Sequence, residues 1–205
     1  PFALEKTEPA IENLRRVGEY LKTGKGKLEN LPRYVASDLF KVMEGVAYLL
    51  TLEKDAELEK QMDEIIDIIA DAQCPDGYLY EWFTAPFKSK NGWGAGDKPY
   101  SFVVHSHELY NMGHMYEAAI AYYRATGKRK WLDVAEKNAQ HINKAFFEGD
   151  PNYNDGKPVN QAPGHQEIEL ALVKLHQATG NPLYLEMAQK FIDIRGITYQ
   201  PEGNG

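Results

Sequence analysis

The sequence predicts an all-α protein built from repeated helical hairpins, and three observations support this fold class. Apolar side chains recur at steps of three and four residues over most of the chain, which is the spacing of one helix face. The tripeptide Ala125-Thr126-Gly127 recurs as Ala178-Thr179-Gly180 within a longer, weak internal repeat. Strand-like alternation is scarce, and Phe102-Val103-Val104 is the best short candidate for extended structure.

Three helices are expected in the first part of the chain, over residues 9–23, 37–52 and 56–73. Each of these segments places its apolar side chains on one face. The apolar positions are Ile11, Leu14, Val17, Tyr20 and Leu21 in the first, Leu39, Val42, Met43, Val46, Leu49 and Leu50 in the second, and Leu58, Met62, Ile65, Ile66 and Ile69 in the third.

Four more helices are expected over residues 106–126, 129–146, 165–179 and 182–194. The longest of them turns Leu109, Met112, Met115, Ala119 and Tyr122 inward. Gly127 and Gly180 stand where a left-handed residue commonly closes a helix. Pro182 suits the first turn of a helix, where its missing N–H costs nothing.

Two long loops, over residues 74–100 and 148–164, separate the helical hairpins. Loops of this length inside a compact domain are usually functional or mobile. Repeated hairpins share a core by stacking, either as an open solenoid or as a closed α/α toroid. The unequal loop lengths favour an enzyme toroid over a regular solenoid.

The composition excludes several classes of function. Apolar residues make up 43% of the 205-residue chain and charged residues 26%, as in ordinary globular domains. A net charge of −7 argues against a nucleic-acid partner, and the short basic run Lys128-Arg129-Lys130 is expected to be a solvated helix start. No apolar run approaches the roughly 18–20 residues that span a bilayer, so no membrane partner is expected. Because Cys74 is the only cysteine, the chain alone cannot form a disulfide framework or a multi-cysteine metal site.

Histidines near helix starts are the most informative polar residues. His107, Tyr110, Asn111 and His114 share one face of a helix. His107-Glu108 resembles the start of a zinc-protease H-E-x-x-H motif, but Asn111 occupies the position of the second histidine and excludes it. His165 follows a loop and opens a helix, so both His107 and His165 could either bond nearby backbone or point into a cavity.

Paired carboxylates could also run sugar chemistry, one as acid and the other as base or nucleophile. Acidic residues are too common for the sequence alone to select a pair. The candidates are Asp38, Asp76, Glu81, Glu108, Glu167 and Glu169.

Several motifs, taken together, resemble the catalytic domain of glycoside hydrolase family 127, the β-L-arabinofuranosidase group. The strongest is Pro163-Gly164-His165-Gln166-Glu167-Ile168-Glu169-Leu170-Ala171-Leu172. A second is Ser106-His107-Glu108-Leu109-Tyr110 with the following Gly113-His114. Further blocks follow in the order of the family: Ser37-Asp38-Leu39-Phe40-Lys41, Ala72-Gln73, Pro75-Asp76-Gly77-Tyr78-Leu79, Ala118-Ala119-Ile120-Ala121-Tyr122-Tyr123, Thr126-Gly127-Lys128 and Leu132-Asp133-Val134-Ala135.

The resemblance implies an (α/α)6 toroid that removes terminal β-L-arabinofuranosyl groups with retention. In that family a zinc-held cysteine thiolate is the nucleophile and a glutamate is the acid/base, and both lie downstream of the segment matched here. Cys74 matches none of the family's cysteines. The resemblance therefore implies that residues 1–205 form the N-terminal portion of the catalytic domain, with no catalytic residue and no metal ligand of their own, and that zinc belongs to the complete enzyme.

What the resemblance does carry over is the sugar-binding part of the pocket. His107 and His165 are similar to two histidines that hydrogen-bond the arabinofuranose, and imidazole suits that role. Asp38 and Tyr78 are expected at the edge of the pocket. Asn111 takes a place where relatives often carry a small residue or a cysteine.

Two alternatives remain open at the level of the sequence. Other α/α toroids, such as sugar 2-epimerases and unsaturated glucuronyl hydrolases, use His, Asp or Glu without a zinc–cysteine centre. The chain is also compatible with a non-catalytic helical module that presents a binding surface. The expected partner is an L-arabinofuranosyl glycan, a homodimer is compatible with the sequence, and the compartment, cytoplasmic or periplasmic in a bacterium, is left open.

Overall fold

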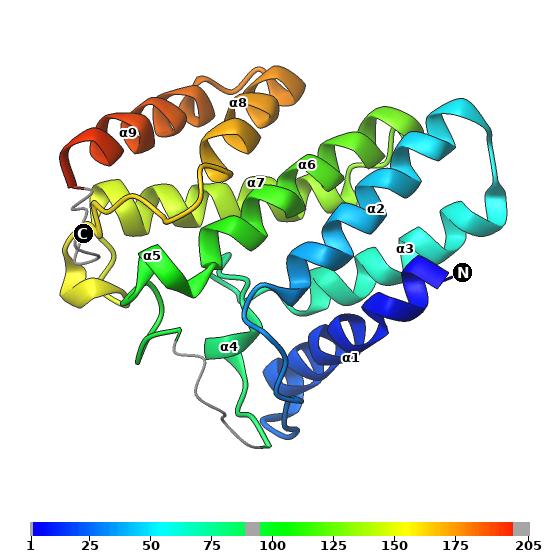
Figure 1. The fold of residues 1–205 in the computed structure, drawn as a ribbon, viewed down its shortest axis with the longest axis horizontal. Helices are drawn as coiled ribbons and strands as arrows, with labels where there is room; N and C mark the ends of the chain where they lie inside the picture. The colour runs from blue at the N-terminus through cyan, green and yellow to red at the C-terminus, as the bar shows by residue number, and fades with distance from the viewer. Residues whose placement is uncertain (1, 89–94, 199–205) are drawn as a thin grey trace.

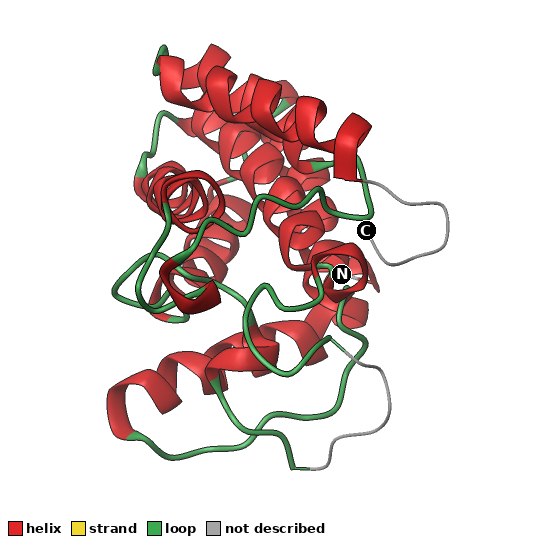
Figure 2. Cartoon of the chain, turned by 90° about the vertical axis from the view of Figure 1, so that its left-hand side faces the viewer, coloured by secondary structure: helices red, strands yellow, loops and turns green. Residues whose placement is uncertain are grey.

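The computed structural model describes residues 2–88 and 95–198, and their side chains from residue 6 to residue 195. Within these ranges it is all-helical, with a single isolated bridge between Leu28 and Phe87 and no strand (Figures 1 and 2). The fold class predicted from the sequence is confirmed. The helices are α1 (Phe2–Thr23), α2 (Val35–Leu52), α3 (Ala56–Asp71), α4 (Glu81–Thr84), α5 (Val103–Ser106), α6 (Glu108–Thr126), α7 (Lys130–Asn143), α8 (Ile168–Thr179) and α9 (Pro182–Thr198), with a π-helical turn at Lys144–Glu148 and a 3-10 turn at Asn154–Gly156.

The seven long helices are those expected from the apolar period, with shifted ends. α1 begins one to two turns before Pro9, and buried Thr7 extends the face that carries Ala10 and Ile11. Gly127 and Gly180 close α6 and α8 in the left-handed conformation, with φ of 76° and 75°, and each N–H bonds a carbonyl of the last helical turn. Both helix ends are therefore confirmed as predicted.

The expectation of extended structure at Phe102-Val103-Val104 is wrong, because Val103–Ser106 forms the short helix α5. No strand lies beside this segment among the described residues, so its backbone groups bond locally. The amides of His105 and Ser106 both donate to the Phe102 carbonyl, at 3.0 and 2.8 Å. Local hydrogen bonds therefore override the β propensity of the two valines.

α2 and α6 pack together in the middle of the molecule, and α6 also contacts α7 and α8. α8 pairs with α9 on one side, while α1 packs on α2 and α3 on the other (Figure 1). One continuous apolar core joins these layers, and Leu39, Met43, Met115 and Leu172 at its centre are fully buried. None of the described helices is long and apolar enough to cross a membrane.

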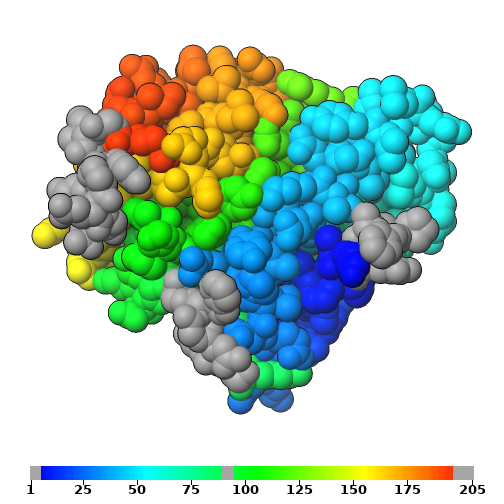
Figure 3. All heavy atoms as spheres, viewed as in Figure 1, coloured from blue at the N-terminus to red at the C-terminus, as the bar shows by residue number. Residues whose placement is uncertain are grey.

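The packing of α2, α6 and α8 brings three distant segments of the chain together on the surface. In the space-filling view the start of α2, the start of α6 and the turn before α8 lie side by side near the middle of one face (Figure 3). These three segments carry the motifs that the sequence singled out.

Candidate functional site

The structure brings His107 and His165 together, although they lie far apart in the sequence. Their Nε2 atoms are 3.2 Å apart and their ring centroids 5.0 Å apart. The Tyr110 ring packs against both, with centroid distances of 4.7 Å to His165 and 5.6 Å to His107. His165 is exposed and His107 is half-buried, so the pair can reach a ligand from the surface.

His107 owes its position to a break in the helix. It adopts a left-handed φ of 65° between α5 and α6, which interrupts the helix expected from residue 106. Its Nδ1 lies 3.1 Å from Arg33 Nε and 2.7 Å from the His105 carbonyl. Since one nitrogen cannot accept from Arg33 and donate to His105 at the same time, the two contacts alternate with the tautomer.

Both histidines are neutral near pH 7. Burial lowers the pKa of His107, and the charge of Arg33 lowers it further against the opposing hydrogen bond to the His105 carbonyl. Burial, followed by the charges of Arg195 and Lys41, also lowers the pKa of His165. A neutral imidazole has one donor and one acceptor nitrogen, and because Arg33 and His105 occupy Nδ1 of His107, its Nε2 is the nitrogen that can meet a sugar hydroxyl.

Asn111 fixes the segment that carries Arg33. It is fully buried, its Nδ2 donates to the Arg33 carbonyl at 2.9 Å, and its Oδ1 accepts from the Ser37 amide at 3.0 Å. Tyr80 also donates to the Arg33 carbonyl, at 3.1 Å. The asparagine at this position therefore ties the start of α2 to α6 behind the histidine pair.

Asp38 lies at the rim of the site. Its side chain is largely exposed, and its Oδ1 is 3.6 Å from Lys41 Nζ. Lys41 in turn donates to the Tyr110 hydroxyl at 2.8 Å and to Ser37 Oγ at 3.2 Å. Asp38 thus reaches the Tyr110 platform only through Lys41.

Tyr78 lies inside the protein, away from the histidine pair. Only 4% of it is exposed, and its hydroxyl donates to Glu108 Oε1 at 2.7 Å. Glu108 also accepts from Ser106 Oγ and from the Tyr100 amide, at 2.7 and 3.1 Å. In this structure Tyr78 and Glu108 support the α5–α6 junction from below rather than line its surface.

A second polar cluster, formed by His114, Glu117, Glu167 and Lys174, lies behind Tyr110. His114 Nδ1 is 3.3 Å from Glu167 Oε1 and 3.6 Å from Glu117 Oε2, and Lys174 donates to Glu117. Burial and the neighbouring Glu117 raise the pKa of Glu167. The pKa of Glu117 is lowered: burial alone would raise it, but hydrogen bonds from His114, Lys174 and Glu167 outweigh that effect. Of the two carboxyl groups, Glu167 therefore holds a proton more readily than Glu117.

This cluster is the candidate for a metal site among the residues that the structure describes, since its ligating atoms lie within 4.8 Å of one another. The Lys174 ammonium already supplies a positive charge to Glu117, and the raised pKa of Glu167 favours its neutral form beside Glu117. The network of the cluster still leaves Glu167 Oε1 buried without a hydrogen-bond partner among the described residues. Its members were missed as a group from the sequence because their spacing forms no motif.

The zinc–thiolate centre that the resemblance implies does not fit the residues of this chain. Cys74, the only cysteine in the sequence, has its Sγ 4.0 Å from Thr84 Oγ1 and is half-buried. Burial raises the pKa of its thiol, which disfavours a thiolate. No step of a mechanism is therefore assigned to zinc on these residues.

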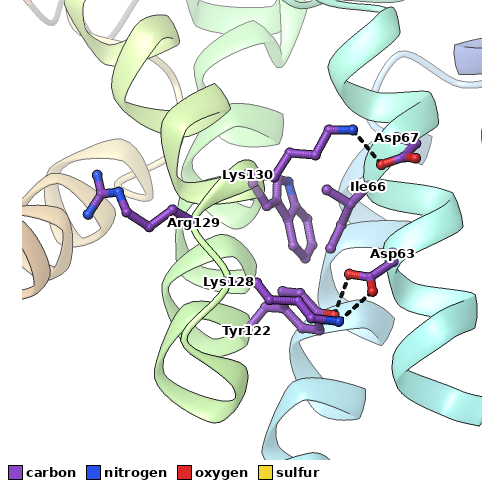
Figure 4. A pocket seen from close by; sticks show the side chains of 8 residues that line it. Asp63, Ile66, Asp67, Tyr122, Lys128, Arg129 and Lys130 are labelled. Carbon is purple, nitrogen blue, oxygen red and sulfur yellow. Dashed lines mark hydrogen bonds and ion pairs between the residues drawn. The ribbon is translucent and has the colours of Figure 1, made fainter. Parts of the chain in front are cut away.

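A cleft of about 480 Å³ lies at the other end of α6, between α3 and the α6–α7 turn (Figure 4). Lys128 and Lys130 of the basic run bond Asp63 and Asp67 across it, at 2.5 and 2.6 Å, and the Tyr122 hydroxyl also donates to Asp63. The basic run is about half exposed, as expected of a solvated helix start. Through these ion pairs, Lys128 in the α6–α7 turn and Lys130 at the start of α7 hold this part of the chain against α3.

Comparisons with known proteins identify one enzyme family. The family model for the β-L-arabinofuranosidase GH127 catalytic domain matches residues 10–204. A non-reducing end β-L-arabinofuranosidase of Bifidobacterium longum is 42% identical over 160 residues, which cover 78% of this chain and 23% of that protein.

Solved structures give the same picture. A GH127 β-L-arabinofuranosidase from Geobacillus stearothermophilus T6 is 41% identical with a TM-score of 0.74, over 94% of this chain and 27% of that chain. A GH127 β-arabinofuranosidase is 38% identical with a TM-score of 0.83, over 98% of this chain and 30% of that chain. The chain thus spans less than a third of the length of these relatives. It belongs to glycoside hydrolase family 127 and forms part of the catalytic domain of that family.

Proposed function

We propose that this chain supplies the sugar-binding part of a retaining β-L-arabinofuranosidase that removes terminal L-arabinofuranosyl groups from glycans. The observation that carries the proposal is the pair of half-buried His107 and exposed His165, whose Nε2 atoms lie 3.2 Å apart beside the Tyr110 ring. Family membership favours this activity over the 2-epimerase, unsaturated glucuronyl hydrolase and non-catalytic alternatives.

The chemistry of the pair suits a furanose. Each neutral imidazole presents one N–H donor or one nitrogen acceptor, so the two rings together can bracket adjacent sugar hydroxyls. Tyr110 offers an aromatic face for the C–H side of the ring, and Lys41 holds its hydroxyl at 2.8 Å. Zinc, when bound in the complete enzyme, would stabilise the nucleophilic thiolate, and we assign the zinc ligands, the nucleophile and the acid/base to residues outside this chain.

The proposal is tested by His107→Ala and His165→Ala in the longest natural form of the protein. Each variant removes a charge-neutral hydrogen bond to the sugar, so kcat/KM for a β-L-arabinofuranoside should fall about 10- to 100-fold. His176→Ala, at the other end of α8, is the matched control and should stay within about twofold of the parent. Unchanged hydrolysis and arabinose binding in both His107→Ala and His165→Ala would rule out the proposal.

A further inference from the structure

Arg195, near the end of α9, bonds the turn that presents His165. Its Nη1 donates to the Pro163 carbonyl at 2.7 Å and its Nη2 to the His165 carbonyl at 3.2 Å. Its Nε and Nη2 also donate to Glu169 Oε1, at 3.0 and 2.5 Å. Arg195 thus joins both ends of the Pro163–His165 turn to a carboxylate on α8.

Arg195 supplies hydrogen bonds to the two carbonyls that flank Gly164 in this turn. The residue before α8, Glu167, makes no side-chain cap hydrogen bond. Gly164 packs so closely on the Val104 carbonyl that a Cβ would stand 2.1 Å from its oxygen, which fixes the position of the turn but not the direction of its peptide groups. The directions of the two flanking carbonyls are set by the guanidinium.

The chemistry requires an arginine. Its planar fork carries several N–H groups in fixed directions and can serve two carbonyls and a carboxylate together, whereas a lysine ammonium is a single point charge. Only 18% of the Arg195 side chain and 8% of the Glu169 side chain is exposed, so their positions are tightly determined. Loss of both carbonyl contacts would release the backbone on either side of Gly164, and a displacement of the His165 Cα would separate His165 from His107.

We infer that Arg195 is a positioning residue for His165, which holds the imidazole in place for the sugar through two backbone carbonyls. This inference rests on the proposed function of His165. It predicts that the contribution of Arg195 to sugar binding exists only while His165 is present.

The test is a double-mutant cycle in the longest natural form of the protein, with Kd for L-arabinose and KM and kcat for an L-arabinofuranoside as readouts. Arg195→Gln should raise Kd and KM about tenfold in the parent and less than about twofold in the His165→Ala background. Arg195→Lys keeps the ion pair with Glu169, so its melting temperature should stay close to that of the parent while its affinity falls as in Arg195→Gln. Arg124→Gln, the same kind of change at an exposed position on α6, should leave all values within about twofold.

Each other outcome overturns the inference in a recognisable way. If Arg195→Gln or Arg195→Lys weakens binding equally with and without His165, Arg195 does not act through that histidine. If His165→Ala weakens binding and the Arg195 variants do not, the inference fails and the proposed function stands. If His165→Ala itself leaves binding unchanged, the proposed function fails first, and the inference with it.

Discussion

Glu108 shows how one residue beside the site links burial to pH. The side chain is fully enclosed, and it accepts hydrogen bonds from Tyr78, Ser106 and the Tyr100 amide. Burial raises the pKa of Glu108 from its ordinary 4.5 to about 7, although these hydrogen bonds lower it in part. The left-handed His107, just ahead of α6, is therefore followed directly by a buried carboxyl that titrates near neutrality.

This shift gives a signed prediction for stability. Between about pH 4.5 and pH 7 the unfolded chain has released the Glu108 proton while the folded protein keeps it, so the free energy of unfolding falls as the pH rises. Glu108→Gln is neutral in both states. The loss of unfolding free energy between about pH 5 and pH 7.5, measured by urea denaturation, should therefore be about 2 kcal/mol smaller in the variant than in the parent. Glu19→Gln, on the exposed face of α1, is the control, and equal slopes for Glu108→Gln and the parent would contradict the argument.

At the scale of residues, the sequence predicted the roles of some members of the site and not of others. His107 and His165 stand in motifs, so they could be selected before the structure was known. Arg195 and Asn111 act on backbone carbonyls and amides of distant segments, and such contacts leave no spacing pattern in the sequence. Tyr78 was expected at the pocket edge on the strength of its motif, and its burial beneath the site depends on tertiary packing.

At the scale of elements, α6 packs tightly against the residue before α8 where Gly113 faces Glu167. A Cβ on Gly113 would stand 2.5 Å from Glu167 Cγ and 3.1 Å from its carbonyl carbon. The residue type at position 113 thus decides how near the turn carrying His165 can come to the helix that follows His107. Without a glycine there, the two histidines would separate.

Two glycine substitutions in helices should therefore change stability in opposite directions. Gly113→Ala must push the turn before α8 outward and should lower the free energy of unfolding by roughly 1–3 kcal/mol, despite the better helix propensity of alanine. Gly45→Ala, in α2, meets nothing within 4 Å and should raise it by up to about 1 kcal/mol. Urea denaturation of both variants checks this, and a stabilised Gly113→Ala protein would show that α6 and the turn are not in tight contact.

Helix ends also show where reading the sequence succeeds. Gly127 and Gly180 were correctly assigned because glycine in the left-handed region is a local preference. The helix expected from residue 106 instead begins at Glu108, and the one expected from residue 165 begins at Ile168. Both helix starts differ from the prediction because they depend on contacts with other segments, and the spacing of apolar residues carries no information about such contacts.

At the scale of the whole molecule, one apolar core runs from α1 to α9. The periodicity of the sequence was sufficient to predict the helices that build this core and the stacking of their hairpins. It could not predict that α2 and α6 form the central pair, because the order in which faces meet depends on loop paths and on mutual fit of side chains. Over the described residues the structure is all-helical, and its match to a solved GH127 structure is consistent with part of a helical toroid.

A continuous core predicts cooperative unfolding of the 205-residue chain. Trp82 on α4 and Trp131 on α7 belong to the same cluster, so tryptophan fluorescence and far-ultraviolet circular dichroism should report one coincident transition in urea. Met115 is fully buried near the middle of α6 and belongs to the same cluster, so Met115→Ala should lower the free energy of unfolding by roughly 2–5 kcal/mol and shift both signals together. Leu52→Ala is the control, because its side chain is 85% exposed and should matter by less than about 0.5 kcal/mol. Two separated transitions in the parent, or a shift of only one signal in Met115→Ala, would contradict this prediction. Either result would mean that α1–α3 and α6–α9 unfold independently and that polar contacts alone hold together the site between them.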